Sequence, residues 1–502
     1  MESVAPAPPA RTEEPLTAPA WWPFWIAFGV ALTLRLLWPE VRPLHHDEGV
    51  NGWFLYRLLD GYRWEYDPER FHGPFLYFFG APFAILLGMS ETVLRLPVML
   101  ASSAMVLLLL PLRRRLGRAG VTAAAWLLAV SPSLVYYGRD LIHETYLVVL
   151  TLALVAAVSL WLETGRDRDL VLAALTLGLL LTVKETAALT LAGLAAGAVA
   201  AWWAAGRPPV LARLGTVPLR TRRLAAAAIV VPYVLLFTSF FTNPWGLVDS
   251  FRAFLPWTEK GIEGSGHEKP WPYFFKLLGT FEPAVLAGGV LGGAAALWRR
   301  NPFGVFCFAW WASQLAAYTV IPYKTPWLVL NMILPLALSA GALLGEIGRR
   351  QLTGAVRAGI AGVGLLLVAW TASKAIEVSF LRYDDERLGL VYVQTTREVR
   401  DLMKLIEDAA ARSPEGRQGL PIRFYTNNRW PLPWYLREYH GTLYLKEVPY
   451  SLSGDVLIFE PNQEPDIRAG LKDWRKYQRR VFTLRKNVKL VVYVRPGSRV
   501  ST

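Results

Sequence analysis

The chain has 502 residues, of which 53% are hydrophobic and only 18% are charged, and its mean hydropathy is +0.30. Soluble domains are about 45–50% apolar and about 25% charged, so this composition excludes a purely soluble enzyme, a disordered chain and a fibrous repeat. The formal charge of +14 does not indicate nucleic-acid binding, because most short basic clusters lie between long apolar runs and are typical of cytoplasmic loops. The single cysteine, Cys307, excludes an intramolecular disulfide.

The first 20 residues are rich in proline and alanine and predict a disordered tail, residues 1–20. The first apolar run lacks a small-residue cleavage pattern after it and is interpreted as a retained helix. Runs of about 20 apolar residues fit a bilayer core about 30 Å thick, and eleven of them predict membrane spans. The predicted spans are 21–39, 92–112, 119–137, 144–162, 169–183, 186–204, 224–241, 282–298, 302–320, 326–345 and 357–377.

One further apolar stretch, residues 73–88, is short for a span and contains Pro74 and Pro82, which favours a re-entrant or interfacial helix. If it crossed the membrane, the arginines at 113–118 would face the side opposite to the later basic clusters. As a non-crossing segment it leaves every cluster on one side, so the positive-inside rule predicts a cytoplasmic N-terminus and an external C-terminus. Residues 21–377 are therefore expected to form a mainly α, multi-pass bundle in the inner or plasma membrane.

From Val378 onward the composition becomes ordinary and charged, which predicts a small extracytoplasmic α/β domain at 378–502. No glycine-rich phosphate loop or metal-ligand spacing is evident in it. Acceptor recognition or shielding of the site is the favoured role, and a purely structural cap is the alternative. Helices are expected at 395–411, 434–439 and 466–480, and strands at 422–425, 456–459 and 488–494.

The first predicted outer connection contains two imidazoles, His45 and His46, followed by two carboxylates, Asp47 and Glu48. These groups supply general-base and ligand chemistry near neutral pH. The alternative is helix capping, with Asp47 as the N-cap of a helix over 50–59 and Glu48 favoured by the helix dipole. Capping and catalysis are compatible, and we expect a functional role for this cluster.

Other outer connections also carry ionisable residues. Lys184 and Glu185 interrupt an otherwise apolar stretch, and charges near membrane depth usually line a cavity, with interfacial snorkelling as the alternative. Lysines flanked by prolines and aromatic residues present a rigid positive charge suited to a phosphate. The catalytic candidates are therefore His46, Asp47 and Glu48, and the substrate-binding candidates are His45, Arg139, Glu144, Lys184, Glu185, His267, Lys269 and Lys324.

These residues predict a membrane-level pocket for a substrate with a lipid tail, an anionic phosphate and a polar group to be transferred. Several short motifs occur in a defined order along residues 20–380. They are Arg35 with Asp47-Glu48, Phe71-His72-Gly73-Pro74, Leu94-Arg95-Leu96-Pro97, Tyr136-Tyr137-Gly138-Arg139-Asp140, His267-Glu268-Lys269-Pro270-Trp271 and Tyr323-Lys324-Thr325-Pro326-Trp327. The ordered set resembles the GT-C superfamily of integral-membrane glycosyltransferases. Within it, the chain is similar to the protein O-mannosyltransferase-like and aminoarabinose-transferase-like branch, in particular the bacterial and archaeal group called flippase activity-associated.

The resemblance implies transfer of a hexosyl or pentosyl group from a polyprenyl-phosphate-linked donor, normally with inversion, at the outer membrane face. The acceptor is an unidentified glycan, lipid or protein of the cell envelope. Asp47 matches the acidic residue that acts as general base or orients the acceptor, since an attacking alcohol must lose its proton. Lys269, Arg139 and Lys324 are the cations expected to face the leaving phosphate, and His267 is expected to hydrogen-bond it or act as an acid.

Metal dependence stays open at this point. The Asp-x-Asp pattern of many metal-using members is absent near Asp47, which favours a metal-free site, yet His46, Asp47 and Glu48 offer ligands for a divalent ion. The leading alternative function is a lipid-linked glycan flippase or a flippase accessory protein, although the inverted repeats typical of transporters are not evident. A non-catalytic scaffold is the third alternative, and it leaves the charges near membrane depth without a purpose.

Overall fold

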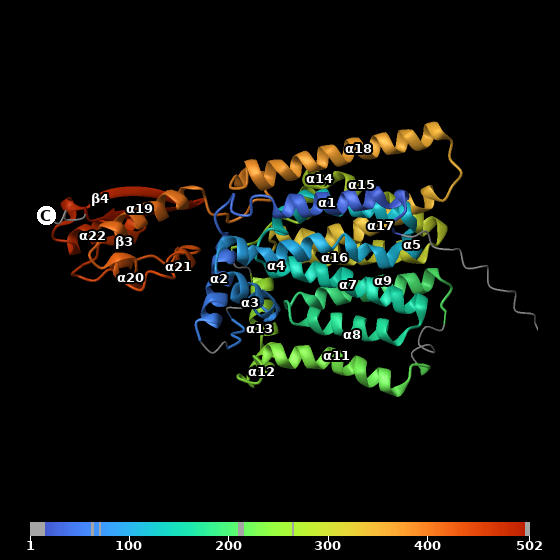
Figure 1. The fold of residues 1–502 in the computed structure, drawn as a ribbon, viewed down its shortest axis with the longest axis horizontal. Helices are drawn as coiled ribbons and strands as arrows, with labels where there is room; N and C mark the ends of the chain where they lie inside the picture. The colour runs from blue at the N-terminus through green and yellow to red at the C-terminus, as the bar shows by residue number, and fades with distance from the viewer. Residues whose placement is uncertain (1–15, 62–64, 70–71, 209–214, 264–265, 497–502) are drawn as a thin grey trace, which may run out of the picture.

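In a computed structural model, which describes residues 16–61, 65–69, 72–208, 215–263 and 266–496, the apolar runs form a long bundle of helices. Helices are expected there because hydrocarbon offers no partner to backbone N–H and C=O groups. Figure 1 shows a small α/β domain beyond one end of this bundle. Most of the predicted disordered tail and Phe71 of the second motif lie outside the described residues, and Pro19–Trp21 forms a 3-10 turn, η1.

Each of the eleven predicted spans contains a helix. By length and apolar composition, six helical segments of the described chain qualify as spans, or seven if α14 and α15, which meet at 108°, are one broken span. Helices α1 and α8 have 15 residues each, fewer than the ~20 that a full crossing takes, so the count of eleven remains a prediction. The bundle helices are α1 (Trp22–Leu36), α4 (Glu91–Ala104) with η2 (Leu107–Leu112), α5 (Arg113–Val130) with α6 (Pro132–Tyr137), α7 (His143–Thr164), α8 (Asp167–Leu181), α9 (Ala187–Ala204), α11 (Leu219–Phe237), α14 (Tyr273–Phe281), α15 (Pro283–Arg299), α16 (Pro302–Val320), η3 (Pro326–Val329) with α17 (Leu330–Gly348), and α18 (Gly354–Ile376) with the π-helical turn η4 (Glu377–Leu381).

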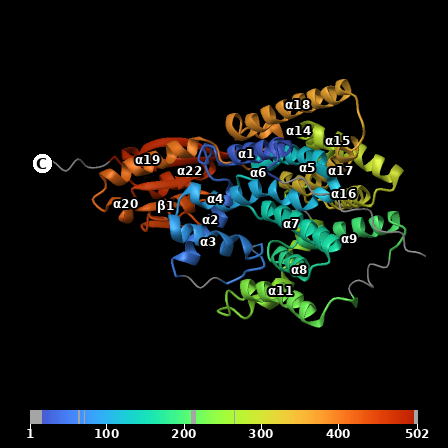
Figure 2. The same cartoon turned by 45° about the vertical axis from the view of Figure 1, so that its right-hand side comes forward.

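Short helices cover the end of the bundle that faces the α/β domain. They are α2 (His46–Leu59), α3 (Phe75–Leu87), α12 (Gly246–Arg252) and α13 (Phe254–Glu263), and both cartoon views place α2 beside the domain (Figures 1 and 2). The 13 residues of α3 span about 20 Å at 1.5 Å per residue, too short for a hydrocarbon core of about 30 Å. This length agrees with the predicted non-crossing helix at 73–88.

The basic clusters from separate connections gather at the opposite end of the bundle. Arg299, the last residue of α15, pairs with Glu346 of α17 at 2.5 Å. A Cβ added to Gly117, inside the first arginine cluster, would lie 2.9 Å from the guanidinium of Arg349. The molecule therefore has one end rich in arginine and another that carries α2 and the α/β domain.

The C-terminal domain holds a five-stranded sheet of order β2-β1-β3-β5-β4. Strand β1 is parallel to β2 and β3, whereas β5 is antiparallel to β3 and β4. An α/β domain was predicted, but its helix at 466–480 is wrong beyond Gly470, because 478–485 forms the edge strand β4. Exposed Arg479 and Arg480 obscure the alternation of that strand, as charges on edge strands commonly do. The elements are η5 (Glu386–Leu388), α19 (Glu398–Arg412), α20 (Gly416–Gly419), β1 (Ile422–Phe424), α21 (Leu432–Tyr435), β2 (Thr442–Tyr444), β3 (Val456–Phe459), η6 (Pro461–Gln463), α22 (Glu464–Gly470), η7 (Trp474–Lys476), β4 (Gln478–Arg485) and β5 (Val488–Val494).

The domain docks directly on α2. A Cβ added to Gly49 would lie 2.3 Å from Cβ of Pro431, and one added to Gly52 would lie 2.9 Å from Cδ1 of Trp434. Only glycine permits so close an approach of α21 to this face of α2. The helix that begins beside Asp47 is therefore packed between the bundle and the C-terminal domain.

Candidate active site

Helix α2 begins with a capping box rather than with the predicted cap. The Nδ1 of His45 accepts a hydrogen bond from the backbone N–H of Asp47 at 3.0 Å, and the Glu48 carboxylate accepts from the N–H of His45 at 2.9 Å. The expectation that Asp47 caps a helix over 50–59 is wrong, because His45 caps it and the helix already begins at His46. This arrangement leaves the carboxylate of Asp47 without a capping role.

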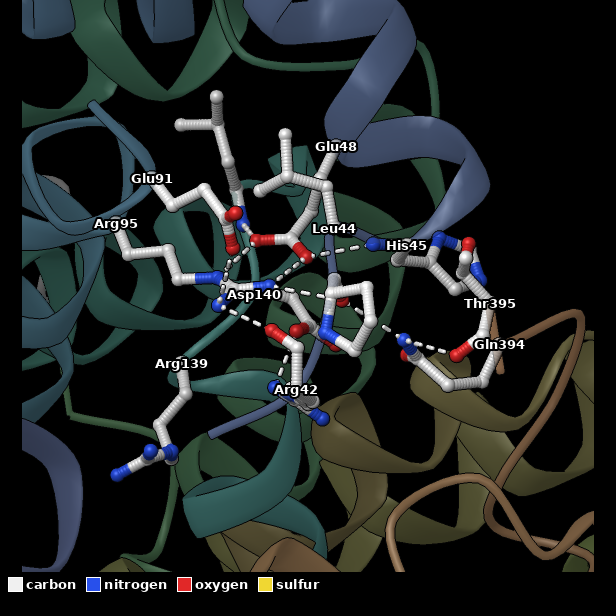
Figure 3. Close-up of polar contacts among 12 residues, drawn as sticks. Arg42, Leu44, His45, Glu48, Glu91, Arg95, Arg139, Asp140, Gln394 and Thr395 are labelled. Atoms are coloured by element: carbon white, nitrogen blue, oxygen red, sulfur yellow. Dashed lines mark hydrogen bonds and ion pairs between the residues drawn. The ribbon is translucent and has the colours of Figure 1, made fainter. Parts of the chain in front are cut away.

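Glu48 is fully buried and is directed at Arg95 (Figure 3). Its two oxygens accept hydrogen bonds from Nε and Nη2 of Arg95 at 2.7 and 2.6 Å, and one accepts from the N–H of Leu141 at 3.1 Å. Burial opposes ionisation, but the Arg95 charge and hydrogen bonds outweigh it and lower the pKa of Glu48 to about 2. In the same network, Arg42 pairs with Asp140. The saturated contacts of Glu48 indicate a structural role.

Asp47 lines a cavity of about 180 Å³ at the end of the bundle. Within the described ranges its carboxylate has no hydrogen bond and no cation within ion-pair distance. Burial alone would raise the pKa of Asp47, but in the acidic range where this carboxyl titrates the neighbouring His45, His46, His72 and Lys184 favour its ionised form and lower the pKa below 3.8, so the group is ionised at neutral pH. An ionised carboxylate that has neither a hydrogen bond nor an ion pair, and that lies in a partly enclosed site among other ionisable groups, is a functional candidate. The other lining residues are Val50, Asn51, His72, Tyr77, Ile142, His143, Glu144, Lys184, Trp257, Tyr323 and Trp327.

The other ionisable side chains in and around this cavity come from several elements and form pairs. Lys184 Nζ lies 3.0 Å from the Glu144 carboxylate, which also accepts a hydrogen bond from Asn331. Neighbouring Glu185 takes a different partner, since its carboxylate lies 2.7 Å from Nδ1 of His72. Lys184 and Glu185, adjacent in the sequence, are therefore not paired with each other. His72 and Asn331 were not among the predicted site residues, although His72 belongs to the second motif.

The two proline-flanked lysine motifs meet at this end of the bundle. Glu268 and Tyr323 form an isolated antiparallel bridge, and the N–H of Lys324 donates to the carbonyl of His267 at 3.0 Å. This pairing joins segments more than 50 residues apart, which the sequence alone does not reveal. It places Tyr323 in the lining of the cavity and His267 beside it, with ring centroids 5.0 Å apart.

The lysines of these motifs differ in their contacts. Lys269 is half-buried, with its Nζ 5.4 Å from the ring centroid of Tyr392. Lys324 is buried, and its Nζ donates to the carbonyl of Ile321 at 2.6 Å, at the C-terminus of α16. Lys269 is therefore the better placed of the two to meet a ligand.

Arg139 lies outside the cavity lining. Its Nη1 and Nη2 each donate to a carbonyl at 2.7 Å, those of Leu37 and Trp38, and Nη1 also bonds two carbonyls in the last turn of α1. Its guanidinium also packs on the ring of Phe380, 4.4 Å from the centroid. Arg139 thus holds the C-terminal end of α1, and we leave it out of the proposed substrate contacts. Arg35 likewise bonds Ser102 and main-chain carbonyls inside the bundle.

An apolar groove of about 380 Å³ adjoins the cavity, and Lys184 lines both. Helices α8, α9, α11, α12 and α13 form its walls through residues such as Leu191, Val230 and Phe254. A larger cavity of about 1150 Å³ lies between α18 and helices α1, α5, α15 and α17. Its lining contains no ionisable residue, so we assign the chemistry to the smaller cavity.

The potential metal ligands do not converge. Glu48 faces Arg95, away from the cavity that Asp47 lines, and no group of three His, Cys, Asp or Glu side chains is arranged for a metal in the part of the chain that the structure describes. The ring of His46 is neutral, because burial lowers its pKa to about 4, and its Nδ1 has no partner. The donor set His46, Asp47 and Glu48 therefore does not fit a divalent ion in this geometry.

Comparisons with known proteins agree with this fold. Residues 71–242 match the family model described as dolichyl-phosphate-mannose-protein mannosyltransferase. The proteins found by that match and by the structural matches below are GT-C glycosyltransferases, so the similarity predicted from the motifs is confirmed. A comparison with curated proteins found no match.

Two solved structures show the fold at low sequence identity. The chain is similar to ArnT from Cupriavidus metallidurans in a crystal structure bound to undecaprenyl phosphate, with a TM-score of 0.65 and 15% identity, covering 95% of this chain and 98% of that one. It is also similar to the oligosaccharyltransferase of Archaeoglobus fulgidus tethered with an acceptor peptide, with a TM-score of 0.53 and 13% identity, covering 89% and 69%. The membrane bundle and its GT-C fold are therefore established, whereas the substrates are a matter for proposal.

Proposed function

We propose that this protein is a membrane glycosyltransferase that moves a sugar from a polyprenyl-phosphate donor to an acceptor hydroxyl, with Asp47 as general base. The observation that carries the proposal is the ionised, unpaired carboxylate of Asp47 in a cavity whose other charges are paired. The ArnT structure bound to undecaprenyl phosphate supports a donor of this class.

The donor binds where the apolar groove meets the cavity. Its prenyl chain lies in the groove between α9 and α11, where apolar side chains dominate the walls. Lys184 stands where the groove meets the cavity and supplies a positive charge for the phosphate, together with Lys269 and His267 from the loop beside Tyr323. The sugar then occupies the cavity, facing Asp47.

The transfer step is a single displacement. Asp47 accepts the proton of the acceptor hydroxyl as its oxygen forms a bond to the anomeric carbon, and the bond between that carbon and the phosphate oxygen breaks. The electron pair leaves with the polyprenyl phosphate, whose added negative charge the cations stabilise. Attack from the face opposite the phosphate inverts the anomeric configuration.

The site is assigned to the outer membrane face, because the arginine-rich end of the bundle is the opposite end and arginine-rich loops face the cytoplasm. The orientation is testable with single cysteines in a Cys307→Ala background. Ser451→Cys in the C-terminal domain should react with an impermeant thiol reagent in intact cells, and Arg350→Cys should react only after lysis. The reverse labelling pattern contradicts the assignment.

The decisive experiment incubates purified protein in nanodiscs with a panel of polyprenyl-phosphate sugars and candidate acceptors, and detects products by mass spectrometry. A product whose anomeric linkage is inverted, together with released polyprenyl phosphate, is expected. Donor binding without any transfer across the panel, together with donor movement across vesicles, contradicts this proposal and favours the flippase hypothesis.

A further inference from the structure

The segment that joins the bundle to the C-terminal domain, residues 382–397, runs beside the candidate site. From composition alone, this stretch belongs to the start of the predicted C-terminal domain, 378–502. In the structure its carbonyls accept hydrogen bonds from the fourth motif: Tyr136 donates to the carbonyl of Tyr383 at 2.9 Å, and Tyr137 donates to that of Leu390. The segment is therefore fixed directly to the bundle.

Tyr392, in this segment, contacts both the start of α2, which carries Asp47, and the loop that carries His267 and Lys269. Its carbonyl lies 2.8 Å from Nε2 of His45. Because Nδ1 of His45 already accepts from Asp47, Nε2 carries the proton and donates to Tyr392. One end of Tyr392 is thus bound to the residue that caps the helix of the proposed base.

The other end of Tyr392 reaches the cationic loop. Its hydroxyl lies 2.7 Å from Nδ1 of His267, and its ring lies beneath Nζ of Lys269 at 5.4 Å. The same ring meets Trp327, which lines the cavity, at a centroid distance of 6.1 Å. Two of the three residues proposed to face the donor phosphate, His267 and Lys269, therefore contact the same tyrosine.

The backbone beside Tyr392 is held in an unfavourable conformation. Val393 has φ of +53°, a region that β-branched residues strongly avoid. Such a conformation persists only where the surroundings impose it, and buried Gln394 does so by donating to the carbonyl of Pro43 at 3.0 Å. The tertiary contacts of the segment therefore outweigh the backbone preference of Val393, as is common at functional sites.

We propose that Tyr392 is a positioning residue for the transfer reaction, which sets the distance between the general base and the cations that bind the donor phosphate. The inference rests on the proposed function above. It predicts that the hydroxyl acts on donor binding through His267 and that the C-terminal segment is required for activity even when the bundle is folded.

The test is a double-mutant cycle of Tyr392→Phe and His267→Ala in the full-length protein, read by polyprenyl-phosphate binding and by the kinetic constants of transfer. Tyr392→Phe removes only the hydroxyl, so donor affinity should fall about 3–10-fold, the range for one hydrogen bond, and donor KM should rise similarly while kcat changes little. In the His267→Ala background the same substitution should have no further effect.

Tyr477→Phe is the matched control, because it deletes a buried hydroxyl that donates to Gly454 at 2.7 Å inside the C-terminal domain, away from the cavity. It should leave the donor constants unchanged. Wild-type kinetics in Tyr392→Phe, or additive losses in the cycle, overturn this inference while the proposed function stands. A wild-type protein that neither binds nor transfers the donor overturns both.

Discussion

The two sides of the first turn of α2 each carry a carboxylate, and the surroundings of these two carboxylates are opposite in character. On one side, Glu48 and Arg95 are fully buried and their hydrogen bonds are saturated. On the other, Asp47 lines a cavity and has no partner among the described residues. Adjacent carboxylates therefore divide into one that stabilises the fold and one that is available for chemistry. The difference lies in hydrogen-bond satisfaction, which side-chain type alone does not predict.

The largest effect is expected from Asp47→Asn. Loss of a general base typically costs about 10²–10⁴-fold in rate, so transfer should nearly cease. Thermal stability in detergent should stay at the wild-type value, because the carboxylate makes no structural contact and His45 provides the cap. Wild-type transfer rates in this variant would remove Asp47 from the mechanism.

On the buried side, Arg95→Met should act on stability instead. Removing one partner of a buried ion pair typically costs about 3–5 kcal/mol, because the other charge stays buried and unpaired. The expected result is a large drop in thermal midpoint, with near-normal donor KM in the fraction that remains folded. A stable but inactive variant would place Arg95 and Glu48 in the reaction.

Lys184→Met sharpens the assignment of the donor phosphate. Charge-assisted hydrogen bonds contribute about 1.5–3 kcal/mol, so donor affinity should fall about 10–100-fold. Lys374→Met is the matched control, since Lys374 also pairs with a carboxylate, at 2.8 Å, but on α18 near the bundle surface. Equal donor binding in both variants contradicts the proposed seat of the phosphate.

A smaller contrast is expected between the two motif lysines. Lys269→Ala should weaken donor binding about 10-fold with little change in stability, because Nζ is half-buried above Tyr392. Lys324→Ala should mainly lower the thermal midpoint, since Nζ of that residue is bonded to the carbonyl of Ile321. Binding titrations and melting curves of both variants distinguish the two roles.

The pH dependence of stability is the weakest of these effects. Glu48 has a pKa lowered to about 2 in the folded protein from 4.5, so its stabilisation is complete above pH 4.5 and is lost as the pH falls through about 2. Melting curves of the wild type and Glu48→Gln should therefore differ most at neutral pH and converge on acidification. A constant gap down to pH 3 contradicts the role assigned to Glu48.

Much of the fold was predictable because its signals are local. In a membrane, the N–H and C=O groups of an apolar run must hydrogen-bond with each other, which specifies a helix. Each predicted span contains one. Strand β4 was missed because Arg479 and Arg480 on an edge strand mask the two-residue period. The site was predictable only in part. A motif identifies ionisable residues, but it does not reveal which of them already have a hydrogen-bond or ion-pair partner in the folded protein. Arg139 and Lys324 are such cases, because each is bonded to carbonyls at the C-terminal end of a helix.

The sequence by itself determined a membrane-embedded helical bundle, a small C-terminal α/β domain and the motifs of GT-C glycosyltransferases, because hydropathy and short-range patterns depend on neighbouring residues alone. Only the tertiary structure decided which charges are left unpaired. Contacts between residues 47 to 347 positions apart pair Glu48 with Arg95 and bring Tyr392 to His45 and His267. The same fold leaves Asp47 facing the cavity. Whether a polar group has its hydrogen bonds satisfied depends on its neighbours in the folded protein. This difference separates Glu48, the structural carboxylate, from Asp47, the one available for catalysis.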